Sequence, residues 1–255
     1  MHIAVCVKRI PLSGGRWVLT ADSSEIDTSG PSMGFTLSPH EECAAEAAVQ
    51  LVEQNGGSST VLTIGTSDSE EQVRSLLAVG IDRGVLIETD GQEWDPQATS
   101  SALVAQLRAG TPEGAYDLVI CGTEAGDTAD HQVPVRIAHA LGWPVVTNVK
   151  GLTITDGVAR CERAVGSARE VYEVTLPAVI SVKDGVNIPR YPSVPGRIKA
   201  RKKPVDVVAG ERPAPRLEKV RLELVAEEQR SAEVLGEGVA GVAPLVEVFK
   251  KIGVI

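Results

Sequence analysis

The chain has 255 residues, of which 43% are hydrophobic and 3% aromatic, and its formal net charge is −9. This length and hydrophobic content are sufficient for a sizeable aliphatic core. The negative charge argues against binding to a nucleic acid polymer, because no overall positive field attracts phosphates. The four cysteines, Cys6, Cys43, Cys121 and Cys161, form no Cys-x-x-Cys pair. We therefore expect buried, reduced thiols, and neither a zinc ribbon nor a redox dithiol.

The first apolar run, residues 3–7, is too short and too weakly flanked for a signal peptide. No run approaches the roughly 20 apolar residues that span a bilayer. The sequence therefore predicts a cytoplasmic protein with no segment inserted in a membrane.

Short runs rich in Val and Ile alternate with helical patterns along the chain. Strands are predicted at 3–7, 59–64, 85–88, 118–121 and 178–182, and helices at 39–55, 68–79, 99–107 and 132–141. The clearest helix start is Pro39, with Ser38 as its N-cap and Glu41 in its first turn. This alternation predicts an α/β fold, with an open, mostly parallel sheet and helices on both faces.

Two later regions depart from this alternation. Residues 152–160 and 171–176 alternate polar and apolar side chains, which predicts an antiparallel excursion attached to the main sheet. After Pro204 the chain becomes irregular, so we expect an α/β domain over 1–204 and an extended arm over 205–255. Within the arm, residues 244–252 have the spacing of a short amphipathic helix, whose apolar face must pack on this chain or on a partner.

Residues 187–204 combine prolines with a basic run. Because prolines fix the backbone and remove amide donors, residues 189–195 are not expected within a helix or a central strand. Val194 is expected on a projecting turn, followed closely by Lys199, Lys202 and Lys203. The segment is either a partner-recognition loop or a solvated surface loop.

Ligands of open parallel sheets gather beyond the carboxyl ends of the strands. Three predicted loops lie there, starting at Cys6, Gly65 and Gly122. The first places two cations, Lys8 and Arg9, after the first strand, and the third has the small residues that let backbone amides approach an anion. A helix near Gln132 adds N-terminal donors. The loop has neither a P-loop nor a GxGxxG spacing, which excludes the standard NTPase and Rossmann dinucleotide-binding mechanisms.

The histidines give no sign of catalysis or of a metal. His131 follows Asp127 and Asp130, but no nucleophile has a triad context, so His131 is interpreted as a polar loop residue. His2 and His40 lack metal-ligand spacing, and no metal site is predicted.

Ordered matches over nearly the whole chain resemble the beta subunit of electron transfer flavoproteins. The matching segments are Val7-Lys8-Arg9, Ser38-Pro39-His40-Glu41, residues 74–83, residues 122–127 with Gln132, Leu141 to Pro144, Leu176 to Val179, the Asn-x-Pro-Arg-Tyr motif at 187–191 with the basic tail that follows it, and Lys250 to Gly253.

The resemblance implies a Rossmann-like, adenine-nucleotide-binding fold in an electron-carrier subunit that is not an enzyme. An alpha subunit would hold most of the FAD, while this subunit would bind AMP structurally and dock flavoprotein dehydrogenases. The cofactor-binding residues would be Cys6, Ser38, Pro39, His40, Glu41, Gly65, Thr66, Gly122, Thr123, Glu124, Ala125, Gly126, Asp127, Thr128, Ala129, Asp130, His131, Gln132 and Val133. The partner-binding residues would be Tyr191, Val194, Pro195, Ile198, Lys199, Lys202 and Lys203.

Several positions depart from the family pattern. Val133 and Pro134 stand where the family has Thr or Val and then Gly, His40 replaces a Phe, and Val194 replaces the Leu often found as the apolar anchor. Two other functions stay open: a bifurcating variant with a second FAD in the beta site, and a stand-alone adenine-nucleotide-binding protein. The basic tail after the anchor favours the simple carrier.

Overall fold

The computed structural model describes residues 1–12, 17–30, 33–225 and 233–255. Contacts within the chain divide it into two compact units, Met1–Arg221 and Leu222–Ile255. Residues 226–232 of the expected arm lie outside the described residues. No helix in the described part is both long and apolar enough to cross a membrane.

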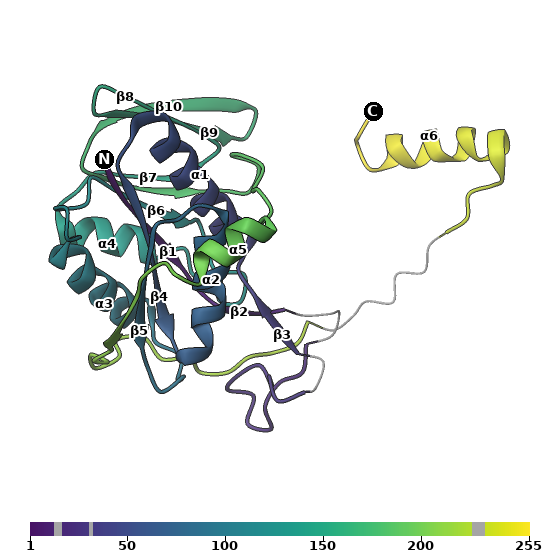
Figure 1. Ribbon diagram of the computed structural model, residues 1–255. Helices are drawn as coiled ribbons and strands as arrows, with labels where there is room; N and C mark the ends of the chain where they lie inside the picture. The colour runs from purple at the N-terminus through teal and green to yellow at the C-terminus, as the bar shows by residue number, and fades with distance from the viewer. Residues whose placement is uncertain (13–16, 31–32, 226–232) are drawn as a thin grey trace. The chain divides into compact units, whose positions relative to one another are not determined.

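The first unit is built on a seven-stranded sheet in which all neighbouring strands are parallel (Figure 1). Its spatial order is β12 (Val205–Ala209), β5 (Arg83–Glu88), β4 (Ser58–Gly65), β1 (His2–Val7), β6 (Leu118–Gly122), β11 (Ala178–Val182) and β7 (Val145–Val149). The five predicted strands are all present, and β7 and β12 are additional. The central strands are buried on both faces, as their unbroken apolar runs predict.

Helices cover both faces of this sheet. On one face, α1 (Pro39–Asn55) and α2 (Glu70–Val79) pack against alternate strand residues such as Ile3 and Val5. On the other face, α3 (Pro96–Ala109) and α4 (Val133–Leu141) pack against Ala4 and Cys6. The predicted open α/β fold is thereby confirmed.

Strand order determines where a ligand would bind. From β1 the chain proceeds through β4 and β5 on one side, and then returns to place β6 and β11 on the other side. The sheet therefore reverses its direction of winding between β1 and β6, and the crevice beyond their carboxyl ends is the usual ligand position in such sheets.

The antiparallel region differs from its prediction. It forms a separate sheet of three strands, β8 (Gly151–Thr155), β9 (Val158–Val165) and β10 (Ala168–Thr175), whereas two strand-like segments attached to the main sheet were expected. Asp156 and Gly157 both adopt positive φ, and the resulting turn splits the predicted segment 152–160. A two-stranded ribbon of β2 (Ile10–Leu12) and β3 (Gly34–Thr36) was not predicted.

The proline-rich segment also differs from its prediction, because α5 (Val194–Ala200) is a short helix. The side chain of Ser193 caps it by accepting a hydrogen bond from the Gly196 amide. Pro195 lies in the first turn, where a missing amide costs nothing. Val194 is thus the first residue of a helix rather than part of a turn.

Beyond α5, the segment assigned to the arm begins with β12, which pairs with β5 over its whole length. The second unit contains a 3₁₀ turn, η2 (Gly238–Gly241), and α6 (Val242–Lys251), close to the predicted helix 244–252. None of the residues of α6 is buried, and its apolar residues include Leu245 and Phe249.

Replacing Asp95 by Ala should destabilise the first unit by about 1 kcal/mol, the usual value for an N-cap. The Asp95 carboxylate accepts from the Ala98 amide at 2.7 Å, and also from the amides of Arg216 (2.7 Å) and Leu217 (2.9 Å). The variant should therefore also accelerate amide hydrogen exchange at residues 216–217. Unchanged exchange there would mean that the carboxylate does not hold this segment.

Candidate functional site

The start of α1 lies against the ends of β1 and β6. Ser38 and Glu41 form a reciprocal capping box: the Ser38 side chain accepts from the Glu41 amide, and Glu41 Oε2 accepts from the Ser38 amide at 3.1 Å. The other carboxyl oxygen of Glu41 accepts from the Lys8 amide at 2.7 Å. Glu41 therefore joins the first turn of α1 to the residue that follows β1.

Glu41 has an unusual protonation equilibrium. Burial raises the pKa of its carboxyl to about 7, against the opposing effect of the hydrogen bonds from Ser38 and Lys8. The side chain is therefore partly protonated near neutral pH, at the centre of the predicted site.

Gly122 allows β6 to approach α1. A Cβ added there would lie 2.9 Å from Glu41 Cγ and 3.2 Å from the Glu41 amide nitrogen, closer than such atoms pack. At the end of β4, a Cβ on Gly65 would lie 2.3 Å from Ser69 Oγ. Glycine at 122 therefore lets the end of β6 lie close to α1, and glycine at 65 lets the end of β4 lie close to the turn that leads into α2.

A chain of charges crosses the site. The Lys8 ammonium lies 2.7 Å from Asp127 Oδ2 and 3.3 Å from Glu93 Oε1, and Glu93 also pairs with Lys219. Burial acts to lower the pKa of Lys8, but the two carboxylates outweigh it and the pKa is raised. Asp127 Oδ1 is buried and, within the described residues, has no hydrogen-bond partner. It is an acceptor available to a ligand donor.

Two histidines flank Glu124. The carboxylate of Glu124 lies 2.8 Å from His131 Nε2 and 3.4 Å from His40 Nε2. His40 Nδ1 accepts from the Asp184 amide at 2.8 Å, so a neutral His40 ring carries its proton on the nitrogen that faces Glu124. No group of three His, Cys, Asp or Glu side chains in the described residues is arranged to hold a metal ion.

The backbone of the β6–α4 segment, residues 122–133, has a strained path. Ala129 and His131 both adopt positive φ, at 47° and 56°. Thr123 is buried and bonds through its hydroxyl to the Val182 carbonyl at 3.0 Å. Since Pro134 has no amide hydrogen, the first turn of α4 offers one donor fewer than usual.

Three further predicted cofactor residues lie on β1 and at the end of β4. Cys6 is buried in the core on the α3–α4 face, so only its backbone is available to a ligand. Gly65 is the last residue of β4, where its carbonyl accepts from the Thr89 amide at 2.9 Å, and Thr66 follows it. Glu93, which lies between β5 and α3, joins the charge chain although nothing in the sequence marked it. Lys8 was noted as a cation after the first strand but was not among the predicted site residues.

The predicted docking segment, residues 187–204, presents its larger apolar side chains to solvent, whereas Ala200 is buried. Tyr191 is 96% exposed and Val194 73%, and Ile198 is also exposed. Lys203 differs from the other predicted partner residues, because its ammonium donates to the Leu77 carbonyl at 3.0 Å and to the Ile81 carbonyl at 2.6 Å. The Lys203 ammonium therefore binds carbonyl groups at the end of α2.

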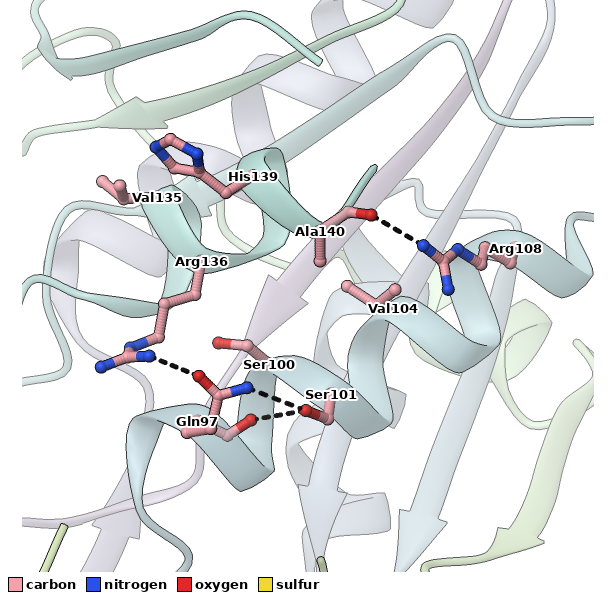
Figure 2. Close-up of a pocket in the computed structure, with 9 residues that line it drawn as sticks. All are labelled: Gln97, Ser100, Ser101, Val104, Arg108, Val135, Arg136, His139 and Ala140. Atoms are coloured by element: carbon pink, nitrogen blue, oxygen red, sulfur yellow. Dashed lines mark hydrogen bonds between the residues drawn. The ribbon is translucent and has the colours of Figure 1, made fainter. Parts of the chain in front are cut away.

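A cavity of about 570 Å³ lies elsewhere, between α3 and α4 (Figure 2). Arg136 bonds there to the side-chain oxygens of Gln97 and Gln132, and Arg108 donates to the Ala140 carbonyl at 2.7 Å. Figure 2 shows Arg136 reaching Gln97 and Arg108 reaching Ala140 across the two helices. None of the predicted site residues lines this cavity.

The sequence model of a protein family, described as the electron transfer flavoprotein domain, matches residues 32–212 of the chain. The chain belongs to the electron transfer flavoprotein family. Electron transfer flavoprotein subunit beta of Bacillus subtilis is 34% identical over 81% of this chain and 78% of its own length. The subunit beta of Mycobacterium bovis is 36% identical over 81% and 78%. The Saccharomyces cerevisiae protein, a probable subunit beta, is 29% identical over 99% and 97%.

These electron transfer flavoprotein relatives confirm the resemblance found in the sequence, and their names agree with the expected electron-carrier subunit rather than an enzyme. The match at residues 32–212 includes the start of α1, the β6–α4 segment and the docking segment. Most of the candidate site therefore lies within the matched domain, whereas Cys6, Lys8 and Lys219 lie outside the matched residues.

Proposed function

We propose that this chain is the beta subunit of a heterodimeric electron transfer flavoprotein, which accepts electrons from flavoprotein dehydrogenases and passes them to a downstream acceptor. An alpha subunit would hold most of the FAD, and this chain would bind AMP and dock the dehydrogenase. The observation that carries the proposal is the match of the electron transfer flavoprotein domain over residues 32–212. The flavin, when bound, supplies the redox chemistry.

The residues present fit a small adenine nucleotide. There is no space for a side chain at Gly122 beside α1. At this position the β6–α4 segment therefore presents only backbone groups to a ligand. The unpaired Asp127 Oδ1 suits a ribose hydroxyl or an adenine amino group, both of which donate hydrogen bonds. Amides of the β6–α4 segment and the start of α4 would face the phosphate, with one donor missing at Pro134.

The docking role is supported by exposure. Tyr191, Val194 and Ile198 place apolar surface in water close to Lys199 and Lys202, both of which are exposed. An apolar knob beside cations suits a partner with an apolar pocket and an acidic rim, because the knob supplies desolvated contact and the charges accelerate encounter. Lys203 contributes by holding the segment on α2.

Cofactor content tests the proposal directly. The chain is co-expressed with its candidate alpha subunit, the complex is purified, and FAD and AMP released by denaturation are quantified. We expect one FAD and one AMP per heterodimer. Two FAD and no AMP would replace the simple carrier by a bifurcating one, and a failure to form any complex would favour a stand-alone nucleotide-binding protein.

A further inference from the structure

The docking segment is attached to the body of the protein at both ends. At its start, Asn187 Nδ2 donates to the Cys43 carbonyl of α1 at 2.9 Å. At its end, Arg74 of α2 donates to the carbonyls of Ala200 (2.9 Å) and Lys203 (2.8 Å). Gly196 lies so close to α2 that a Cβ there would be 2.4 Å from the Ala78 carbonyl oxygen.

Arg190 makes more hydrogen bonds to the body of the protein than Asn187 or Arg74 does. Its Nε lies 2.9 Å from Glu46 Oε2, and its Nη2 lies 3.0 Å from Glu46 Oε1. The same guanidinium meets Glu53 through Nη1 at 2.7 Å and Nη2 at 3.0 Å. The two carboxylates lie seven residues apart on the same face of α1. Each of them forms a bidentate ion pair with the planar guanidinium of Arg190.

Burial makes this attachment more than a surface ion pair. The Glu46 side chain is 4% exposed, and besides Arg190 it is bonded by Gln50 Nε2 at 2.7 Å. The backbone amide of Arg190 also donates to Glu46 Oε2, at 3.2 Å. A buried carboxylate needs such partners, so Glu46 holds both the side chain and the backbone of Arg190 in place.

We propose that Arg190 is a positioning residue, whose ion pairs with Glu46 and Glu53 hold the docking segment in its binding conformation before a dehydrogenase arrives. This inference rests on the proposed docking function. Tyr191 directly follows Arg190, and Val194 begins α5 three residues later. With the chain fixed at Arg190 and on α2, little conformational freedom is lost when these exposed side chains bind, and binding is stronger for that reason.

Hydrogen exchange of the purified heterodimer tests the positioning role without any dehydrogenase. Arg190→Met should raise amide exchange over residues 188–198 by about tenfold, since an attachment between two elements is lost. Arg190→Lys keeps the charge but not the planar guanidinium, and should give a smaller increase. Arg169→Met is the matched control, because it removes an arginine that pairs with Glu162 in the separate sheet of β8, β9 and β10. It should leave exchange in 188–198 unchanged.

Arg190→Met leaves the buried Glu46 carboxylate without its ion-pair partner, which could destabilise the fold. A milder variant is therefore tested as well. Glu53→Gln alters the exposed carboxylate and leaves the Glu46 pair intact. It should also accelerate exchange over 188–198, by about twofold to threefold as for an exposed ion pair. If a correctly folded Arg190→Met or Glu53→Gln heterodimer exchanges like wild type in this segment, the positioning role is wrong.

A second measurement separates this inference from the docking function. The rate of flavin reduction in the heterodimer is followed with a substrate-reduced flavoprotein dehydrogenase at increasing concentrations. Arg190→Met should raise the half-saturating dehydrogenase concentration about tenfold and leave the limiting rate unchanged. Faster exchange with unchanged docking would overturn the functional part of the inference, whereas absence of any transfer in wild type would refute the docking function itself.

Discussion

Replacing Val194 by Asp should lower the efficiency of electron acceptance from the dehydrogenase on the order of 30-fold, equivalent to about 2 kcal/mol of docking free energy. Val194 is 73% exposed at the first position of α5, so its side chain is not part of the core and is free to contact a partner. A carboxylate placed in an apolar pocket must lose its hydration without gaining a partner. The rate of flavin reduction at limiting dehydrogenase concentration measures the effect.

The same change should leave the heterodimer folded and its FAD and AMP content unaltered. An acidic residue at the first position of a helix interacts favourably with the helix dipole, and no buried contact of Val194 is lost. Val194→Leu should preserve or improve docking, because it enlarges the apolar contact without adding charge.

Val165 offers a matched control, because it is 47% exposed at the end of β9 in the separate three-stranded sheet. Val165→Asp adds the same charge to the same residue type outside the docking segment, and should leave the transfer rate unchanged. If Val194→Asp transfers electrons as fast as wild type, or if Val165→Asp slows transfer equally, Val194 is not the apolar anchor.

The sheet was predictable where strands are buried on both faces, because only an unbroken apolar run such as residues 118–121 satisfies that environment. β12 and β7 lie at the two edges of the sheet, where mixed sequences are tolerated, and both were missed. The helix α5 was missed because prolines normally oppose helices, although Ser193 is a favoured N-cap residue and Pro195 lies in the first turn, where a missing amide is tolerated.

The sequence predicted which segments form the site, but not which side chains pair with one another there. Strand ends and the resemblance located Ser38, Glu41 and Gly122, which the structure brings together. Glu93 joins Lys8 from 85 residues away along the chain, and such a pairing has no local signal. Likewise, the basic run after Val194 did not distinguish Lys203, which bonds to α2, from its exposed neighbours, because only the fold brings the end of α2 close to it.

Glu41 should make the protein less stable as pH rises from about 4.5 to about 7. Its pKa is about 7 in the folded protein, against an ordinary value of 4.5. Below this range the carboxyl is protonated in both states and the contribution to stability is fully present. As pH rises, the unfolded chain loses the proton first, and the free energy of unfolding falls by roughly 3 kcal/mol in total.

Glu41→Gln isolates this contribution, because an amide does not titrate in this range. The variant should be less stable than wild type at pH 4.5 by about 1–3 kcal/mol, since the side-chain amide group turns a donor toward the backbone amide of Lys8 or Ser38. Its deficit should shrink toward pH 7 as wild type loses the stability of the protonated carboxyl. Urea unfolding of both heterodimers across this range measures the difference.

Glu71→Gln is the control, since Glu71 is an exposed glutamate in the first turn of α2 and its replacement should leave the pH profile parallel to that of wild type. The carbon-13 resonance of the Glu41 carboxyl should titrate near pH 7 and be absent from the Glu41→Gln spectrum. A resonance that titrates near 4.5 would show that the hydrogen bonds from Lys8 and Ser38 stabilise the carboxylate enough to offset its burial, and the pH dependence would then have another origin.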